Sequence, residues 1–232
     1  MNFTDHVQVF EQVAAQMRVQ NPDQAPGMKA YMRHQFEFLG LPTPMRRDLL
    51  KPFLIEGKKE VKVSGINRSF VEACWARDER EFQYNALDYL AAVKKYLEPE
   101  DVDWLRDLAE TKSWWDTVDR IDVLVGEVLW HNPNDALILS WAKDQNFWVR
   151  RIAINHQRPR KQNTNTALLE KILIMNFGST EFFINKAIGW ALREYSKTDP
   201  TWVADFITRH SQRMAPLSIR EGAKRLPENL KR

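Results

Sequence analysis

The chain has little of several features on which common classes of protein depend. Its 232 residues include one cysteine, Cys74, so a disulfide framework and a cysteine-based zinc site are both excluded. No apolar run approaches the roughly 20 residues that span a bilayer, and the first residues lack the basic-then-apolar pattern of a signal peptide. We therefore expect a protein of the reducing cytoplasm.

Motifs that hold cofactors or activate nucleophiles are missing as well. The five histidines are scattered without the spacing of metal ligands, and the sequence has no P-loop, no GxGxxG and no GxSxG. Cys74 lies between Ala73 and Trp75, which favours a buried side chain over a reactive thiol. We therefore predict that the protein uses no metal and no other cofactor.

Glycine is also scarce, with eight in the whole chain, and turn signals fall at helix-length intervals. No stretch sustains the alternation of apolar and polar residues that marks a strand. Helix starts are predicted at positions with capping chemistry: Thr43-Pro44, Asp78, Ser113, Asn132-Pro133, Asn146, Ser179 and Asp199-Pro200. The sequence thus predicts an all-α protein.

Four of these predicted starts are almost evenly spaced. Asp78, Ser113, Asn146 and Ser179 are separated by 35, 33 and 33 residues, and the pattern Glu81-Phe82-x-x-Asn85 recurs as Glu181-Phe182-x-x-Asn185. A period in the thirties with two helices per unit is typical of a helical solenoid, whose stacked repeats curve around a concave face. An ordinary helical bundle is the alternative. We expect residues 1–232 to form one domain.

Charge is distributed unevenly along the chain. The formal net charge is +3, but acidic residues outnumber basic ones by six in residues 1–144, and basic residues outnumber acidic ones by nine in residues 145–232. Such asymmetry favours a surface that binds a polyanion, although solvated helix faces would produce the same count.

The segment from Thr111 to Arg120 is the most informative part of the sequence. Ser113 is a good N-cap, and two tryptophans follow it at the predicted helix start. Trp115 and Asp119 are four residues apart and therefore share a face of that helix. A lone carboxylate beside an aromatic plane suits the binding of a sugar or base next to a developing positive charge. The alternative is an exposed aspartate that pairs with a nearby cation and contributes little.

Cations and an aromatic residue alternate on a later helix. Lys186, Trp190 and Arg193 form one stripe on the helix predicted from Ser179, and Arg151 lies on the helix predicted from Asn146. Cations neutralise phosphates and aromatic planes stack on bases, so this pattern favours nucleic acid. The candidate phosphate-binding residues are Arg150, Arg151, Arg158, Arg160, Lys161, Lys186, Arg193, Arg220, Lys224 and Arg225. Any one of them taken alone has a solvated side chain as its simpler interpretation.

These segments resemble a known family. The similar stretches run from Tyr31 to Gly40, Thr43 to Arg47, Arg80 to Gln83, Thr111 to Asp119 (TKSWWDxVD) and Phe182 to Tyr195 (FFIxKAIGWxLREY). Together they resemble the AlkD-type DNA alkylation-repair glycosylases. The resemblance implies a right-handed superhelical solenoid of HEAT-like helical repeats with a concave basic face.

The resemblance also implies an activity and roles for individual residues. It implies a monofunctional glycosylase, without a lyase step, that removes cationic purines of the N3-methyladenine and N7-methylguanine type from duplex DNA. Asp119 would be the catalytic carboxylate, and Trp115 and Trp190 would hold the deoxyribose of the lesion. Arg151, Lys186, Arg193 and Tyr31 would contact DNA. Such a protein would be a monomer of the prokaryotic cytoplasm, associated with the nucleoid when bound to DNA.

Physical chemistry agrees with this activity. Alkylation at N3 or N7 makes the purine cationic and therefore already a good leaving group, so no general acid is needed. The remaining task is to stabilise the sugar cation and orient water, which a carboxylate between aromatic walls can do. Two alternatives stay open: a non-catalytic helical scaffold that binds DNA or protein, and a protein that binds RNA through basic repeats.

Overall fold

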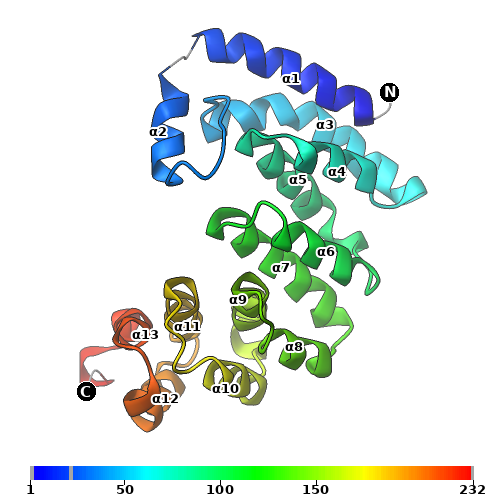
Figure 1. Cartoon of the computed structure of the whole chain (residues 1–232). Helices are drawn as coiled ribbons and strands as arrows, with labels where there is room; N and C mark the ends of the chain where they lie inside the picture. Colours follow the sequence, from blue (N-terminus) through cyan, green and yellow to red (C-terminus); the bar gives the residue numbers. More distant parts are fainter. Residues whose placement is uncertain (1–2, 21–22, 231–232) are drawn as a thin grey trace. The chain divides into compact units, whose positions relative to one another are not determined.

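The computed structural model describes residues 3–20 and 23–230, and it is helical throughout (Figure 1). Within those residues no strand forms, and the one β-bridge joins Glu37 to Glu79. The all-α prediction is therefore confirmed. The chain divides into two compact units, Met1–Leu97 and Glu98–Arg232, which are described separately. The prediction of a single domain stays a prediction.

The described part of the first unit, residues 3–20 and 23–97, contains five α-helices. They are α1 (Phe3–Gln20), α2 (Gln24–Tyr31), α3 (Thr43–Ser64), α4 (Arg68–Ala76) and α5 (Arg80–Val93), followed by the short 3-10 helix η1 (Lys94–Tyr96). Helix α5 packs against α3 and α4, and α1 packs against both of those helices. Buried Glu81 accepts hydrogen bonds from the backbone N–H groups of Leu39, Gly40 and Leu41 at 2.9–3.1 Å, which fixes the loop before α3.

Residues 98–230 of the second unit contain eight α-helices. They are α6 (Asp101–Glu110), α7 (Trp115–His131), α8 (Asp135–Trp141), α9 (Phe147–Asn155), α10 (Thr166–Met175), α11 (Phe182–Tyr195), α12 (Pro200–His210) and α13 (Pro216–Gly222). Four 3-10 helices supplement them: η2 (Arg158–Asn163), η3 (Ser211–Arg213), η4 (Ala223–Arg225) and η5 (Glu228–Leu230).

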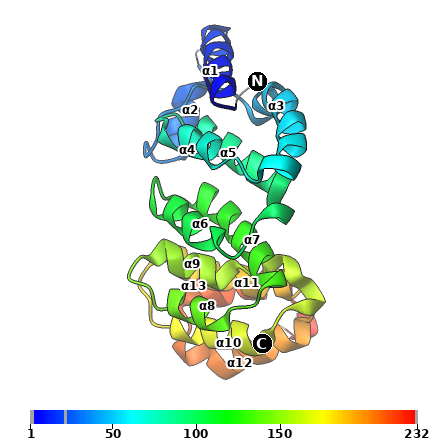
Figure 2. The same ribbon diagram turned by 90° about the vertical axis from the view of Figure 1, so that its right-hand side faces the viewer.

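Two rows of helices make up this second unit. Helices α7, α9, α11 and α13 pack one against the next, and α6, α8, α10 and α12 cover them from one side (Figure 2). This pairing is that of a helical-repeat fold. The right-handed superhelical path and the concave basic face remain predictions.

The helix starts agree with the sequence at some positions and differ at others. Asn146 and Asp199 cap α9 and α12 through their side chains, and α3 begins at Thr43, as predicted. Ser113 is not an N-cap: its hydroxyl donates to the carbonyl of Ala109 at 2.7 Å, which belongs to the end of the preceding helix.

At the other four predicted starts the observed N-cap lies one or two residues later, at Glu79, Trp114, Asn134 and Glu181, so α5, α7, α8 and α11 begin at Arg80, Trp115, Asp135 and Phe182. For α8 and α11 the capping side chain is a later one, that of Asn134 or Glu181. The helices that begin at Arg80, Trp115, Phe147 and Phe182 keep a spacing of 35, 32 and 35 residues.

One glycine permits a close approach between two helices of the second unit. A Cβ on Gly126 of α7 would lie 2.1 Å from the backbone carbonyl oxygen of His156, far inside any tolerable contact. Because glycine has no Cβ, α7 and the end of α9 lie close together. This contact sets the spacing between the helices that carry Asp119 and Arg151.

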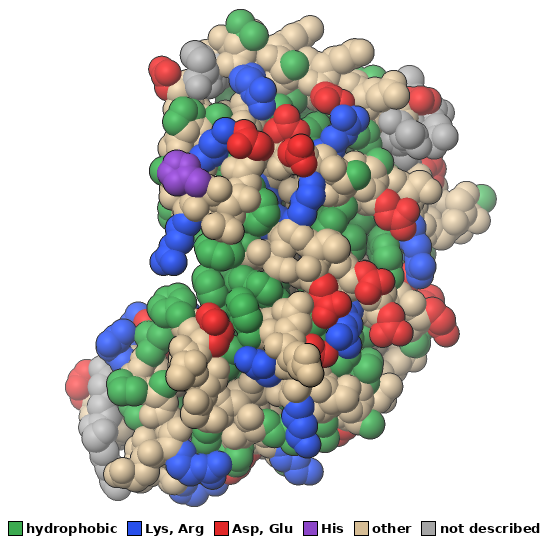
Figure 3. Space-filling view, in the orientation of Figure 1, with side chains coloured by type: hydrophobic (Ala, Val, Ile, Leu, Met, Phe, Trp, Pro, Cys, Tyr) green, Lys and Arg blue, Asp and Glu red, His purple; other side chains and the backbone are tan. Residues whose placement is uncertain are grey.

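Charged side chains are spread over the surface. Within each unit, on the face shown in Figure 3, basic and acidic side chains are interspersed and do not form one unbroken patch of a single sign. Within residues 3–20 and 23–230, no helix has the length and apolar character needed to cross a membrane.

Candidate active site

The two adjacent tryptophans at the start of α7 serve different purposes. Trp114 enters an aromatic cluster, with ring centroids 5.2 Å from Phe183 and 5.9 Å from the buried Trp148. Trp115, one residue later, lines a cavity of about 320 Å³. The cluster therefore anchors the start of α7, and the helical turn directs Trp115 and Asp119 into the same cavity.

Three helices of the second unit supply every residue that lines this cavity, which we call the acidic cleft. Its lining residues are Trp115, Asp119, Arg151, Phe182, Phe183, Lys186, Trp190 and Arg193. All the predicted catalytic residues and three of the four predicted DNA-binding residues are thus brought together. The structure does not test their roles.

Asp119 is held in place by Arg151. The Arg151 Nε and Nη2 atoms donate to the two carboxylate oxygens of Asp119, each at 2.7 Å, and Nη1 donates to the Phe183 carbonyl at 2.6 Å. The Arg151 side chain is 3% exposed and that of Asp119 is 12% exposed. A bidentate pair of this kind fixes orientation as well as charge. Arg151, predicted as a DNA-backbone contact, is therefore placed to orient the carboxylate.

Trp190 is covered on one face by Arg158, a residue at the start of η2. The Arg158 guanidinium carbon lies 3.7 Å from the Trp190 ring centroid, the distance of a close cation–π contact. The Nη2 atom of Arg158 also donates to the Asp119 carbonyl at 3.2 Å and to both Asp122 carboxylate oxygens at 2.8 Å. Arg158 therefore links Trp190 to the helix that carries Asp119.

Asp122 is a second acid on α7, fully buried beneath the cleft. Burial raises its pKa to about 7, the charge of Arg158 opposes that rise, and the nearby charge of Asp119 adds to it. The sequence analysis did not single out Asp122. Its spacing of three residues from Asp119, on the same face of the helix, was the signal that could have found it.

Lys186 and Arg193, at the edge of the cleft, share one acidic partner. Glu221 of α13 accepts from Lys186 Nζ at 2.9 Å, from Arg193 Nη1 at 2.8 Å and from Lys224 Nζ at 2.6 Å. We call these four residues the Glu221 cluster. No local sequence signal points to Glu221, because it lies 28 residues beyond Arg193 and meets it only through the packing of α13 on α11.

The Glu221 carboxylate has a strongly shifted pKa. Its side chain is 4% exposed, and this burial alone would raise the pKa. Hydrogen bonds from Lys224 and Lys186, together with their charges, outweigh burial and lower the pKa from 4.5 to about 2. Glu221 is therefore ionised throughout the range in which DNA-binding proteins are assayed.

This shift predicts a pH-dependent contribution to stability. Because the pKa is lower in the folded chain, the unfolded chain binds more protons between pH 4.5 and 2, and stability falls as pH falls through that range. Urea unfolding of wild type and Glu221→Gln should show a stability difference that shrinks by on the order of 3 kcal/mol between pH 6 and pH 2. An equal difference at every pH would contradict the assignment.

Tyr31, the remaining predicted DNA-binding residue, belongs to the first unit. It ends α2, is 71% exposed and lines a separate cavity of about 360 Å³ with Arg46, Glu81 and Tyr84. The structure describes this cavity within the first unit alone. The role of Tyr31 stays a prediction.

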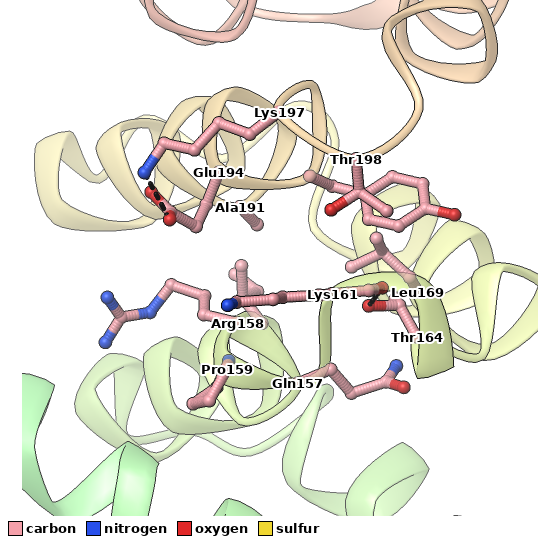
Figure 4. A pocket seen from close by; sticks show the side chains of 12 residues that line it. Gln157, Arg158, Pro159, Lys161, Thr164, Leu169, Ala191, Glu194, Lys197 and Thr198 are labelled. Atoms are coloured by element: carbon pink, nitrogen blue, oxygen red, sulfur yellow. Dashed lines mark hydrogen bonds and ion pairs between the residues drawn. The ribbon is translucent and has the colours of Figure 1, made fainter.

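A second cavity of the second unit, also of about 360 Å³, contains no comparable carboxylate (Figure 4). Its one acidic lining residue, Glu194, forms an ion pair with Lys197, and Lys161 and Arg158 lie across from that pair. Arg158 lines this cavity and also stacks on Trp190 of the acidic cleft. The chemistry of the acidic cleft is not repeated here.

No histidine is among the described residues that line the acidic cleft. Within the described residues, no three His, Cys, Asp or Glu side chains are grouped to hold a metal ion. His156 is fully buried, which lowers its pKa to about 3, and its ring Nδ1 lies 2.8 Å from the Ala153 carbonyl. Cys74 is buried, as predicted, and burial raises the pKa of its thiol.

Paired helices in two rows, with a carboxylate between tryptophans and flanking cations, define a helical-repeat protein with an acidic cleft. Residues 14–226 match the family described as DNA alkylation repair enzyme, and the chain belongs to that family. A solved structure of a predicted DNA alkylation repair enzyme from Enterococcus faecalis is 37% identical, with a TM-score of 0.80. The match covers 90% of this chain and 97% of that one.

No curated protein matches the sequence. Family membership supports a role in DNA repair, with DNA as the partner. It does not specify the reaction or the lesion.

Proposed function

We propose that the protein is an AlkD-type, monofunctional DNA glycosylase that hydrolyses the N-glycosidic bond of cationic alkylated purines in duplex DNA. The observation that carries this proposal is the placement of Asp119. Its carboxylate is locked by Arg151 and lines a cleft between Trp115 and Trp190. A carboxylate on a DNA-binding surface repels the phosphates of the DNA and so weakens binding. We therefore infer that Asp119 has a chemical role that outweighs this cost.

The reaction needs little from the protein beyond electrostatics. The bond between C1′ and the purine nitrogen breaks, the electron pair stays with the base, and the cationic base leaves neutral. The sugar then carries the positive charge, and Asp119 is the anion that stabilises it. Each carboxylate oxygen of Asp119 has two lone pairs and accepts one hydrogen bond from Arg151. One lone pair on each oxygen is therefore still able to accept a second hydrogen bond. Either remaining lone pair can accept a hydrogen bond from the water that attacks C1′, and the proton that this water loses as the C1′–O bond forms is released to solvent.

Aromatic walls suit the same transition state. A ring face carries negative charge density and attracts a cation that lies over it. Trp115 and Trp190 would hold the sugar between them, and the stacked Arg158 fixes the ring of Trp190 from behind. No general acid is required, in agreement with the neutral, buried state of His156.

DNA binding is assigned to the cations at the edge of the cleft. Lys186 and Arg193 would neutralise phosphates near the lesion, and Tyr31 would contact DNA from the first unit. We propose further that the protein acts as a monomer, in the cytoplasm, without a cofactor.

The test is release of free base from methylated duplex DNA, followed by chromatography, together with the salt dependence of binding to the same duplex. We expect release of N3-methyladenine or N7-methylguanine, and affinity that falls steeply as salt rises. Tight, salt-sensitive binding without release of any base would contradict the glycosylase proposal and favour a non-catalytic scaffold. Equal competition by single-stranded RNA would favour an RNA-binding protein.

A further inference from the structure

Glu221 is almost fully buried and yet meets three cations. Two of them, Lys186 and Arg193, line the acidic cleft, while the third, Lys224, comes from the 3-10 helix that follows α13. One Glu221 oxygen accepts from both lysines and the other accepts from Arg193. A single carboxylate thus fixes the ends of two long side chains that are seven residues apart on α11.

The packing of α13 on α11 places Glu221 there. A Cβ on Gly189 of α11 would lie 2.4 Å from the Glu221 Cβ and 3.0 Å from the Ser218 carbonyl oxygen, so only glycine permits this approach. The Ser218 hydroxyl also donates to the Asn185 carbonyl at 2.8 Å, which joins the two helices at a second point. The close contact at Gly189 therefore brings Glu221 within hydrogen-bond distance of Lys186 and Arg193.

The charge of Glu221 opposes the function that its partners would perform. The three cations alone carry +3, and Glu221 reduces the cluster to +2, which weakens its long-range attraction for phosphate. Lysine and arginine lose more side-chain freedom on ordering than most residues. A carboxylate that fixes them in advance lowers the entropy that must be lost when a ligand binds. The two effects on DNA affinity have opposite signs, so an experiment can separate them.

We propose that Glu221 is a positioning residue that holds Lys186 and Arg193 in fixed orientations at the edge of the acidic cleft, where they receive phosphates of the DNA backbone. This inference rests on the proposed function, because it takes DNA as the ligand. It adds a comparison of two effects of Glu221 on DNA affinity. The gain from holding the two cations in fixed orientations is larger than the loss from the negative charge that Glu221 brings.

The first test is binding of a fluorescently labelled, undamaged duplex to Glu221→Gln, by anisotropy, over a range of salt concentrations. Positioning predicts affinity about 5- to 10-fold weaker than wild type, because two long side chains must then be ordered by DNA itself. Charge alone predicts the opposite, tighter binding with a steeper salt dependence. Affinity equal to or tighter than that of wild type would overturn the inference.

Glu194→Gln is the matched control. Glu194 also lies on α11 and also pairs with a lysine, Lys197, but it does not line the acidic cleft. The variant removes one negative charge from the same unit, so binding should be unchanged or slightly tighter. Equal weakening by both variants would contradict a specific role of Glu221.

A doubly substituted background separates positioning from general damage to the fold. In Lys186→Gln/Arg193→Gln, Glu221 has no cleft cation left to orient. Adding Glu221→Gln there should no longer weaken binding and should tighten it slightly, because a negative charge is lost. Weakening of the same size in both backgrounds would show damage to the fold and overturn the inference.

Should Glu221→Gln fail to fold, Glu221→Asp decides the question. It keeps the charge and withdraws the carboxylate by one methylene, so charge alone predicts no change and positioning predicts about 2- to 5-fold weaker binding. Wild-type affinity in this variant would overturn the inference. Release of base by wild type would leave the proposed function intact in that case, whereas a wild type that neither binds duplex DNA nor releases base would overturn both.

Discussion

Asp119→Asn should release methylated purine about 10²–10³-fold more slowly than wild type, measured under single-turnover conditions with excess enzyme. The substitution removes the negative charge that the proposed mechanism places next to the sugar, and it keeps nearly the same shape. Asparagine also presents an N–H₂ group toward the guanidinium of Arg151, where wild type has a second acceptor oxygen at 2.7 Å. The amide can therefore satisfy only one of the two Arg151 donors.

The loss should be confined to chemistry. Asp119 repels phosphates, so affinity for the duplex should stay within about threefold of wild type or become tighter. Asp116→Asn is the control, because Asp116 lies one turn earlier on the same helix and does not line the cleft. Near-wild-type release by Asp119→Asn, or an equal loss in Asp116→Asn, would remove Asp119 from the mechanism.

Arg151→Met should destabilise the folded protein by about 3 kcal/mol in urea unfolding. Methionine fills a similar volume but leaves the Asp119 carboxylate, 12% exposed, without its counter-charge, and it leaves the Phe183 carbonyl without its donor. Breaking a buried pair from one side is costly because the remaining charge stays desolvated.

The double variant Asp119→Asn/Arg151→Met isolates this cause. Its free energy of unfolding should exceed the value predicted by adding the two single-variant changes by at least about 1 kcal/mol, because no unpaired charge remains. Arg150→Met is the control on the same helix. Arg150 donates to the Asp144 carbonyl at 2.8 Å, and the loss of that hydrogen bond should cost about 1 kcal/mol. Simple additivity in the double variant would mean that the ion pair is not the source of the destabilisation.

Much of the acidic cleft could be predicted from sequence because its signals are local. Trp115 and Asp119 share a helix face by their spacing, and Lys186, Trp190 and Arg193 form one stripe for the same reason. All five line the same cavity. The all-α class could also be predicted, because the scarcity of glycine and the regular spacing of capping residues are visible in the sequence. The structure, helical throughout, confirms that prediction.

Contacts between distant elements were not predictable. The DNA contact of Arg151 stays a prediction, but its bidentate pair with Asp119, 32 residues away in the chain, could not be predicted from the sequence. Glu221 was missed because it meets Lys186 and Arg193 only when α13 packs on α11. Asp122 meets Arg158 only through packing as well, but its spacing from Asp119 on the same helix face was visible in the sequence. The N-cap prediction for Ser113 was wrong for a related reason. A hydroxyl between two helices can bond to the end of the first or to the start of the second, and the Ser113 hydroxyl donates to the Ala109 carbonyl at the end of the first.

Gly126 and Gly189 are two positions outside the cleft at which a substitution should disrupt the packing of the helices that form it. Adding a methyl group at either position would meet a neighbour at 2.1 or 2.4 Å and push apart the helices that carry Asp119 or Trp190. A chain with such a substitution would keep every residue of the motif TKSWWDxVD and still displace the side chains that line the acidic cleft. When related sequences are surveyed for an intact cleft, these two glycines should be counted along with its lining residues.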